Sequence, residues 1–165
     1  MKKHSVLFIT QSALIAALYV VLTLFINAFG LANGAIQIRI SEALTILPFF
    51  TPAAIPGLAV GCLLANILTG AVIWDILFGT VATLIGAVGT YLLRKHAWCA
   101  ALPPILSNSI IVPLILQYAY GVPDALWFLM LTVGIGEVLS AGVLGTSLLF
   151  VLKRYAHILF KAKGN

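Results

Sequence analysis

Apolar residues fill the chain in long runs rather than in short alternating patterns. Four runs contain at most one charged residue each: 5–29, 73–93, 99–120 and 125–152. An α-helix needs about 20 apolar residues, at about 1.5 Å per residue, to cross the hydrocarbon core of a bilayer. The pattern therefore predicts four membrane-spanning helices at these positions.

The apolar segment 40–69 is too long for one ordinary span and somewhat short for two. Its centre holds Pro48 and Pro52, and a proline inside a helix breaks the hydrogen-bond ladder. We therefore expect two short passes here, whose exact boundaries the sequence leaves open.

The basic residues distinguish five spans from six. With six spans and both termini in the cytoplasm, every lysine and every arginine except Arg39 faces the cytoplasm. With five spans, Arg94 and Lys95 would face outward while Lys2 and Lys3 stayed inside. Cytoplasmic loops carry the excess of Lys and Arg, so the charges favour six spans. The same topology places Glu42, Asp75 and Asp124 at the outer side. We expect one all-α transmembrane domain over residues 1–165, with six helices and both termini cytoplasmic.

Composition leads to the same class. The chain is 62% apolar and 8% charged, with a mean hydropathy of +1.17, whereas a globular domain is about 45–50% apolar and about 25% charged. The net charge of +5 comes from residues at the ends of apolar runs, so no nucleic-acid partner is expected. Cys62 and Cys99 have no disulfide or metal-ligand spacing, and we expect neither a metal nor a cofactor.

Polar residues inside the apolar runs are the candidate ligand groups. A charge in a bilayer costs at least about 2.5–3.5 kcal/mol on insertion scales and marks a functional site by default. Glu137, near the centre of the last run, either ties two helices together or anchors a ligand, and we favour the ligand role. Asn66 and Asn108 are open to both uses, because amides also join helices by hydrogen bonds; the prolines upstream of Asn108 favour a pocket there.

Four residues near the outer side complete the candidate set. Arg39 and Glu42 either form an ion pair or line an outer site. Asp75 is either a helix cap, where an acid is favoured by the helix dipole, or a ligand group. Trp74 belongs to the interfacial aromatic residues, one or two of which are candidates to stack on a ligand.

Small residues predict closely packed helix surfaces. Ser12, Ala13, Ala16 and Ala17 form overlapping small-xxx-small pairs that we assign to one face of the first helix, and Gly57-xxx-Gly61 repeats the pattern. Such faces serve packing within the bundle or docking onto another membrane protein.

Sequence motifs of enzymes and ATPases are missing from the 165 residues. There is no G-x-x-x-x-G-K-[ST] loop, no H-E-x-x-H and no G-x-S-x-G. We therefore predict a transport or binding protein that has no ATPase motif of its own and is not an enzyme.

Several blocks in order resemble a known family. The blocks are 36–44, 56–62, 75–84, Pro103-Pro104 with Asn108, and 134–137. Over nearly its whole length the chain resembles the QueT family of queuosine-precursor transporters, which are substrate-binding S components of energy-coupling-factor (ECF) importers. The pair Ala13-xxx-Ala17 also looks like the motif by which S components dock on their coupling subunit.

The resemblance implies a six-helix S component in a bacterial cell membrane with its site in the outer half. Its partners would be an ECF transmembrane coupling subunit and two ATPase subunits, and it would deliver substrate by tipping in the membrane. The substrate would be a 7-deazaguanine: the cyano or aminomethyl precursor, or queuine.

The chemistry of a 7-deazaguanine suggests a role for each candidate residue. A carboxylate accepts hydrogen bonds from the N–H and the amino group of a guanine-like edge together, and Glu137 is our candidate. Asn108 or Arg39 would donate to the carbonyl, and Glu42 or Asp75 would hold a cationic arm. The alternatives are an S component for another vitamin or nucleobase, a membrane scaffold protein, or a lone secondary transporter.

Overall fold

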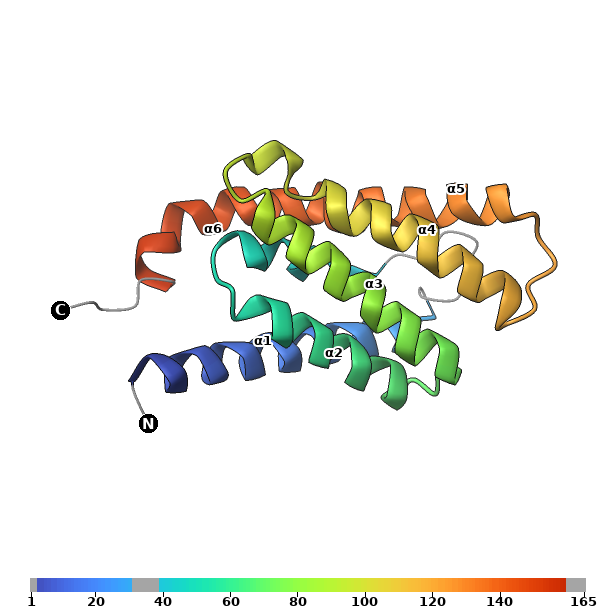
Figure 1. Cartoon of the computed structure of the whole chain (residues 1–165), viewed down its shortest axis with the longest axis horizontal. Coiled ribbons are helices and arrows are strands. Elements are labelled where there is room, and N and C mark those ends of the chain that lie inside the picture. The colour runs from blue at the N-terminus through green and yellow to red at the C-terminus, as the bar shows by residue number, and fades with distance from the viewer. Residues whose placement is uncertain (1–2, 31–38, 160–165) are drawn as a thin grey trace.

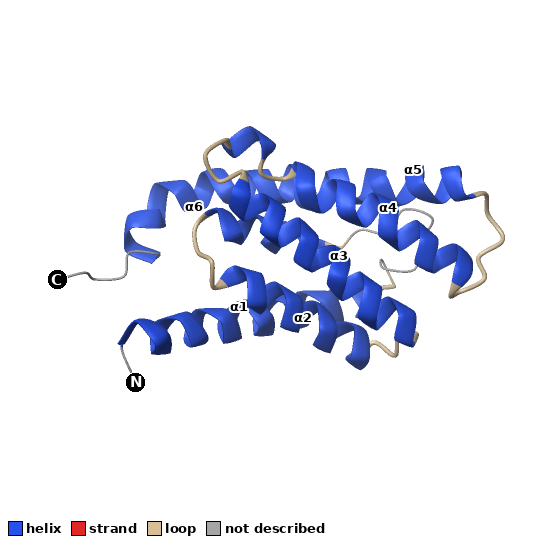
Figure 2. Cartoon of the chain, viewed as in Figure 1, coloured by secondary structure: helices blue, strands red, loops and turns tan. Residues whose placement is uncertain are grey.

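The computed structural model describes residues 3–30 and 39–159, and within these ranges every regular element is a helix (Figures 1 and 2). In chain order the elements are α1 (Lys3–Ala28), η1 (Ile40–Phe49), α2 (Ala54–Leu68), α3 (Ile73–Leu92), η2 (Ala97–Cys99), α4 (Leu102–Tyr118), α5 (Leu126–Glu137), η3 (Val138–Gly145) and α6 (Thr146–Leu159). The predicted all-α class is confirmed.

The four long apolar runs form four helices of membrane-spanning length and composition. They cover Ser5–Ala28, Ile73–Leu92, Ala97–Tyr118 and Leu126–Ala156. These ranges agree with the predicted runs to within a few residues at each end.

The segment 40–69 forms two helices, as its prolines predict. The chain turns between η1 and α2, where Phe50 and Thr51 donate their backbone N–H groups to the carbonyl of Leu47. At 10 and 15 residues, both helices are shorter than an ordinary α-helical span. That each of them crosses the membrane, which would give six spans, stays a prediction.

η1 is a 3₁₀ helix, and it runs through the interior of the bundle. Its residues from Ser41 to Pro48 are all buried. Irregular backbone at membrane depth is tolerated where protein covers it, and α1, α2, α3 and η3 pack around this helix. The burial explains why a helix type that is uncommon beyond 3–4 residues extends here over 10 residues.

The two ends of the described chain lie at the same end of the bundle, as does the connection between α3 and α4 that carries Arg94 and Lys95 (Figure 1). An even number of crossings produces this arrangement. The placement of that end in the cytoplasm stays a prediction, and Lys2, Lys161 and Lys163 lie outside the described residues.

Glycines bring α1 and α2 into backbone contact. A Cβ atom at Gly57 would lie 2.7 Å from the carbonyl oxygen of Ser12, and one at Gly61 would lie 3.1 Å from the Cα atom of Ala16. Ser12 Oγ also donates to the carbonyl of Ala53 at 2.8 Å. The predicted close packing at Gly57-xxx-Gly61 is confirmed, and Ser12 and Ala16 supply the facing surface.

Ala13 and Ala17 are exposed, whereas Ala16 is buried and Ser12 is half-buried. The prediction that all four small residues share one face is wrong. Successive residues of an α-helix are separated by about 100° around its axis, so the pairs Ser12/Ala16 and Ala13/Ala17 point in different directions.

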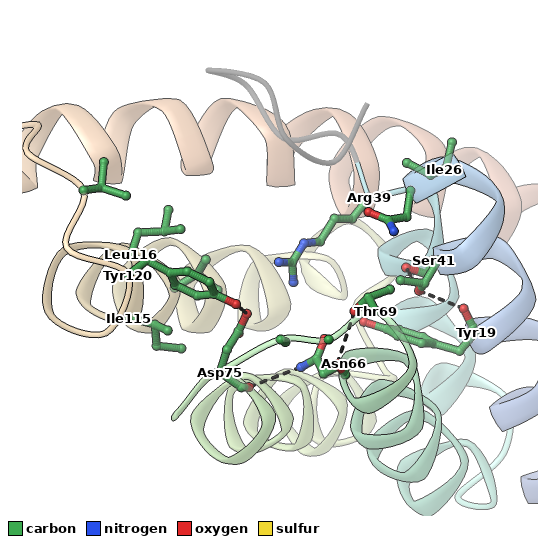
Figure 3. A pocket seen from close by; sticks show the side chains of 16 residues that line it. Tyr19, Ile26, Arg39, Ser41, Asn66, Thr69, Asp75, Ile115, Leu116 and Tyr120 are labelled. Carbon is green, nitrogen blue, oxygen red and sulfur yellow. Dashed lines mark hydrogen bonds between the residues drawn. The ribbon is translucent and has the colours of Figure 1, made fainter. Parts of the chain in front are cut away.

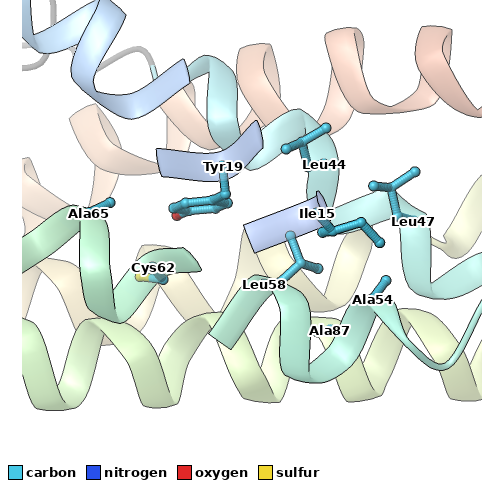
Figure 4. Packing of buried hydrophobic residues seen from close by; sticks show 9 residues of the cluster. All are labelled: Ile15, Tyr19, Leu44, Leu47, Ala54, Leu58, Cys62, Ala65 and Ala87. Carbon is cyan, nitrogen blue, oxygen red and sulfur yellow. The ribbon is translucent and has the colours of Figure 1, made fainter. Parts of the chain in front are cut away.

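A core of small and branched residues holds α1, η1, α2 and α3 together (Figure 4). It comprises Ile15, Tyr19, Leu44, Leu47, Ala54, Leu58, Cys62, Ala65 and Ala87. Most of these side chains are short or have no polar atoms, so the helices approach closely, and Tyr19 brings a hydroxyl group into the same region.

α5, η3 and α6 form one long helix that changes type in the middle. η3 is a π-helix, and η1 packs against it. The backbone N–H of Arg39 donates to Ser140 Oγ at 3.1 Å. The π-helical segment therefore holds the start of η1 in place.

Candidate functional site

A cavity of about 360 Å³ lies where α1, α2, α3 and α4 meet the start of η1. The ends of these helices gather at the end of the bundle that is remote from the two chain ends (Figure 1). Among the described residues, the polar lining of the cavity consists of Tyr19, Thr23, Asn27, Arg39, Ser41, Asn66, Thr69, Asp75 and Tyr120. Ligand pockets measure about 300–1,000 Å³, so the cavity suits a small organic molecule.

Asp75 lies in the first turn of α3, where the helix dipole favours an acid. Its side chain is 7% exposed. Oδ2 accepts a hydrogen bond from the Tyr120 hydroxyl at 2.9 Å, and the backbone carbonyl accepts one from Asn66 Nδ2 at 3.2 Å. Oδ1 is buried and has no hydrogen-bond partner among the described residues. Asp75 is thus held in place with one acceptor atom unused.

Tyr120 connects the end of α4 with the start of α3. Its hydroxyl accepts from the backbone N–H of Val72 at 3.3 Å while it donates to Asp75. Gly121, at φ +66°, allows the chain to turn directly afterwards. Burial, together with the negative charge of Asp75, raises the pKa of Tyr120, so the hydroxyl remains a donor to Asp75 at neutral pH.

Arg39 supplies the cationic group of the cavity. Its guanidinium reaches into the space between the pair Asp75/Tyr120 and the pair Ser41/Tyr19 (Figure 3). It interacts electrostatically with Asp75 and with Glu42. In the described part of the chain, no direct ion pair joins Arg39 to Glu42, so the ion-pair alternative raised by the sequence is not the arrangement found.

Glu42 lies behind the cavity wall. It is 1% exposed, accepts a short hydrogen bond from the Tyr19 hydroxyl, and accepts a second from Asn108 Nδ2 at 3.3 Å. Neither Glu42 nor Asn108 lines the cavity. Tyr19 does line the cavity, so its hydroxyl connects the cavity wall with Glu42 behind it.

Glu137 ends α5 and is 5% exposed. It interacts electrostatically with Glu42 and with the Asn108 side chain, and its Oε2 atom has no hydrogen-bond partner among the described residues. It does not line the cavity. The structure thus brings Glu42, Asn108 and Glu137 together as a buried acid cluster, and we use that name for these three residues below.

The other two candidates lie in different places. Asn66 lines the cavity beside Asp75. Trp74 is 55% exposed, stacks on Phe78 with ring centroids 6.0 Å apart, and borders a separate apolar cleft between α3 and α4. Of the predicted ligand residues, the cavity therefore contains Arg39, Asp75 and Asn66.

Hydroxyl groups of the cavity were missed by the sequence analysis. Thr23 donates to Ser41 Oγ at 2.9 Å, and Tyr19 lies one helical turn before Thr23. The available signal was the four-residue spacing of these two hydroxyls in an otherwise apolar run, which places them on one helix face. No group of three or more His, Cys, Asp or Glu side chains suited to a metal ion occurs among the described residues.

Two comparisons with known proteins find relatives. The family model described as QueT transporter matches residues 9–154. The queuosine precursor transporter QueT of Lactococcus lactis subsp. cremoris (strain MG1363) is 35% identical over 85 residues, which are 52% of this chain and 50% of the relative. The match thus spans half the length of that relative. No solved structure matches the chain. The family match covers most of the chain and nearly all of the four helices of membrane-spanning length in its described part, so the protein is a multi-pass membrane protein that belongs to the QueT transporter family.

Proposed function

We propose that the chain is the substrate-binding subunit of an importer for queuosine precursors, and that its cavity binds a 7-deazaguanine. The observation that carries the proposal is the cavity itself, which combines a cation, Arg39, with a held carboxylate, Asp75, and an amide, Asn66. A guanine-like edge carries an N–H, an amino group and a neighbouring carbonyl, so it needs acceptors and donors side by side.

The membrane setting strengthens the match between cavity and ligand. A charged group at membrane depth is costly unless it has a partner or lines a polar cavity. A flat heterocycle with donors on one side and an acceptor beside them would satisfy the carboxylate and the guanidinium together. The family assignment supports the same class of cargo, since the Lactococcus relative is a queuosine precursor transporter.

We further propose that transport is powered by partner proteins in an ECF assembly. The sequence contains no G-x-x-x-x-G-K-[ST] loop, so an ATPase of that kind would come from two partner subunits through a transmembrane coupling subunit. Ala13 and Ala17 offer an exposed small-residue surface on α1, which suits close approach by another membrane helix. In this proposal the cavity faces outward, both termini are cytoplasmic, and the subunit tips in the membrane to release its ligand.

Isothermal titration of the purified chain in detergent tests the proposal. The ligands are the cyano- and aminomethyl-deazaguanines and queuine, with guanine as the control. We expect saturable binding of at least one deazaguanine well above guanine. A folded, ligand-free sample that binds none of them would overturn the assignment, and selective binding of an unrelated vitamin would reassign the cargo.

A further inference from the structure

We infer that Asn66 is a specificity-determining residue of the cavity: its side-chain oxygen, Oδ1, accepts a hydrogen bond from the exocyclic amino group of a guanine-like ligand, while Arg39 donates to the ligand carbonyl. This inference rests on the proposed function. It adds a neutral acceptor to the charged residues Arg39 and Asp75, and it assigns recognition of the amino group to an amide rather than to one of the buried acids.

The Asn66 amide is held in one orientation. Its Nδ2 atom donates to the backbone carbonyl of Asp75 at 3.2 Å and to Cys62 Sγ at 3.8 Å. A backbone carbonyl accepts and cannot donate, so the amide atom that faces it is the nitrogen. An amide nitrogen carries two hydrogens, and these two contacts use both of them. Asn66 therefore offers a ligand its oxygen and not its nitrogen.

The position of Gly79 indicates which side of the amide is free. A Cβ atom at position 79 would lie 3.2 Å from Asn66 Nδ2 and 2.9 Å from Asp75 Oδ1. Both of these atoms thus lie against the backbone of α3, whereas the Asn66 oxygen is on the other branch of the planar amide. Figure 3 shows the amide nitrogen directed at Asp75, at the edge of the space that the Arg39 guanidinium enters.

Asn66 Oδ1 is open to the cavity. Among the described residues, the buried side-chain atoms that lack a hydrogen-bond partner and have almost no accessible surface are Asp75 Oδ1, Ser109 Oγ, Gln117 Oε1 and Glu137 Oε2. Asn66 Oδ1 also lacks a partner in this part of the chain, but it is not one of these enclosed atoms, and Asn66 lines the cavity. A ligand N–H can therefore reach it.

The acids are less suited to this role. Asp75 Oδ1 is enclosed, and Asp75 Oδ2 already accepts from the Tyr120 hydroxyl at 2.9 Å. Glu42 and Glu137 do not line the cavity. Asp75 therefore contributes a charge opposite to that of Arg39 and a backbone carbonyl that holds the Asn66 amide in position.

Arg39 and Asn66 together set the polarity of the ligand edge. A guanidinium has donors only, and the Asn66 amide has only its acceptor left. A guanine-like base has a carbonyl on one side of its ring N–H and an amino group on the other, so one edge suits both residues. A hypoxanthine-like base keeps the carbonyl but has no amino group, and it would leave Asn66 Oδ1 without a partner.

The test compares two ligands on four proteins by isothermal titration in detergent. The ligands are 7-cyano-7-deazaguanine and the same molecule without its exocyclic amino group. Because a buried acceptor left unsatisfied is costly, the wild-type protein should prefer the amino compound by about tenfold, which corresponds to about 1.4 kcal/mol. In Asn66→Leu, which has a similar size but no acceptor, the preference should fall to about twofold or less.

Asn66→Asp separates recognition of the ligand from the holding of α3. Like Asn66→Leu it loses the amide nitrogen, but it keeps an acceptor oxygen, so the preference should stay at about tenfold or more. Asn66→Ala takes the place of Asn66→Leu if the latter does not fold, with the same expected loss.

Gln11→Leu is the matched control. It makes the same change from an amide to an apolar side chain, at a residue that accepts a hydrogen bond from Thr51 Oγ1 at 3.1 Å and does not line the cavity. The wild-type preference should be kept.

The outcomes separate the inference from the proposed function. The role of Asn66 would be overturned, and the importer assignment left intact, by any of three results: equal binding of the two ligands by the wild-type protein, an unchanged preference in Asn66→Leu, or a loss of preference in Asn66→Asp or Gln11→Leu as well. If the folded wild-type protein bound no deazaguanine at all, the proposed function would fail, and this inference with it.

Discussion

Tyr19 stands between two groups of polar side chains that resemble each other in composition and differ in their bonding. On the cavity side, Arg39 and Asp75 line the open space, and the Tyr120 hydroxyl donates to Asp75. On the interior side, the buried acid cluster bonds largely within the protein, with Glu42 held by Tyr19 and by Asn108. An acid buried in a membrane helix is thus not by itself a ligand group. The property that distinguishes the two groups is a place in the lining of the cavity.

The largest effect on stability should follow from removing the carboxylate of the buried acid cluster. Glu42→Ala leaves the Tyr19 hydroxyl and the Asn108 amide without their partner in a closed interior. Each orphaned buried group costs about 1–3 kcal/mol, so for the two groups we expect a loss of roughly 2–6 kcal/mol, seen as a lower Tm in detergent. Asp124→Ala, which removes an exposed acid, should leave the Tm unchanged. Equal melting of the two variants would contradict the assignment of Glu42 to the structural side.

Removing the cation from the cavity should weaken binding and leave the fold intact. Arg39→Met keeps the length of the side chain but loses the donors for the ligand carbonyl. Because truncating one partner of a charged hydrogen bond costs about 2 kcal/mol or more, titration should show a thirtyfold or larger loss of deazaguanine affinity. The control is Arg94→Met, at an exposed position between α3 and α4. Unchanged affinity in Arg39→Met would remove Arg39 from the site.

A single methyl group beside Asp75 should have a smaller effect. The Cβ of Gly79→Ala would meet Asp75 Oδ1 at 2.9 Å and push it from its position. We expect a three- to tenfold loss of affinity by titration, in line with the roughly 0.5–1.5 kcal/mol of an off-rotamer side chain. In Gly134→Ala the nearest atom to the new Cβ is Ser109 Oγ at 3.4 Å, and affinity should be kept. Equal affinity of both variants would argue against a positional role for Gly79.

The smallest effect on binding is expected on the outer face of α1. Ala17→Leu adds volume at an exposed position, so stability and ligand affinity should change by less than about 0.5 kcal/mol, while cellular uptake of the ligand falls if this face docks on a partner. Ala16→Leu, on the face packed against Gly61, should lower the Tm, since overpacking costs about 1–3 kcal/mol. Full uptake by Ala17→Leu would place the docking surface elsewhere.

Much of the fold was predictable because membrane insertion depends on local quantities. The length of an apolar run sets whether a helix can span. Pro52 lies in the break between η1 and α2, and Pro48 lies one residue before the end of η1. The 3₁₀ form of η1 and the π form of η3 were not predictable. Both arise from how these segments pack against each other, and neither has a local sequence pattern of its own.

The sequence predicted how far along the membrane normal the site residues lie, but not which way their side chains point. Charge placement along the chain put Arg39 and Asp75 near one membrane face, and the structure places both in one cavity. The sequence ranked Glu137 first because it lies in the middle of a span. The position of a residue along a helix does not determine which neighbours its side chain contacts, because the rotation of the helix about its own axis depends on packing. The sequence analysis gave Tyr120 no role of its own, although its hydroxyl donates to Asp75 at 2.9 Å.

The π-helical segment η3 makes the length of the chain between Glu137 and Thr146 matter more than its composition. A π turn contains more residues than an α turn, because its hydrogen bonds run from i to i+5. Deleting one residue from Val138–Gly145 would let the segment close into α geometry, and the helix beyond it would keep nearly the same facing relative to α5. Inserting one residue, with no further π turn to absorb it, would instead rotate everything beyond it by about 100°, and Leu149, which is fully buried in α6, would turn out of its core. Among relatives of this protein, η3 should therefore accept the loss of one residue more readily than the gain of one.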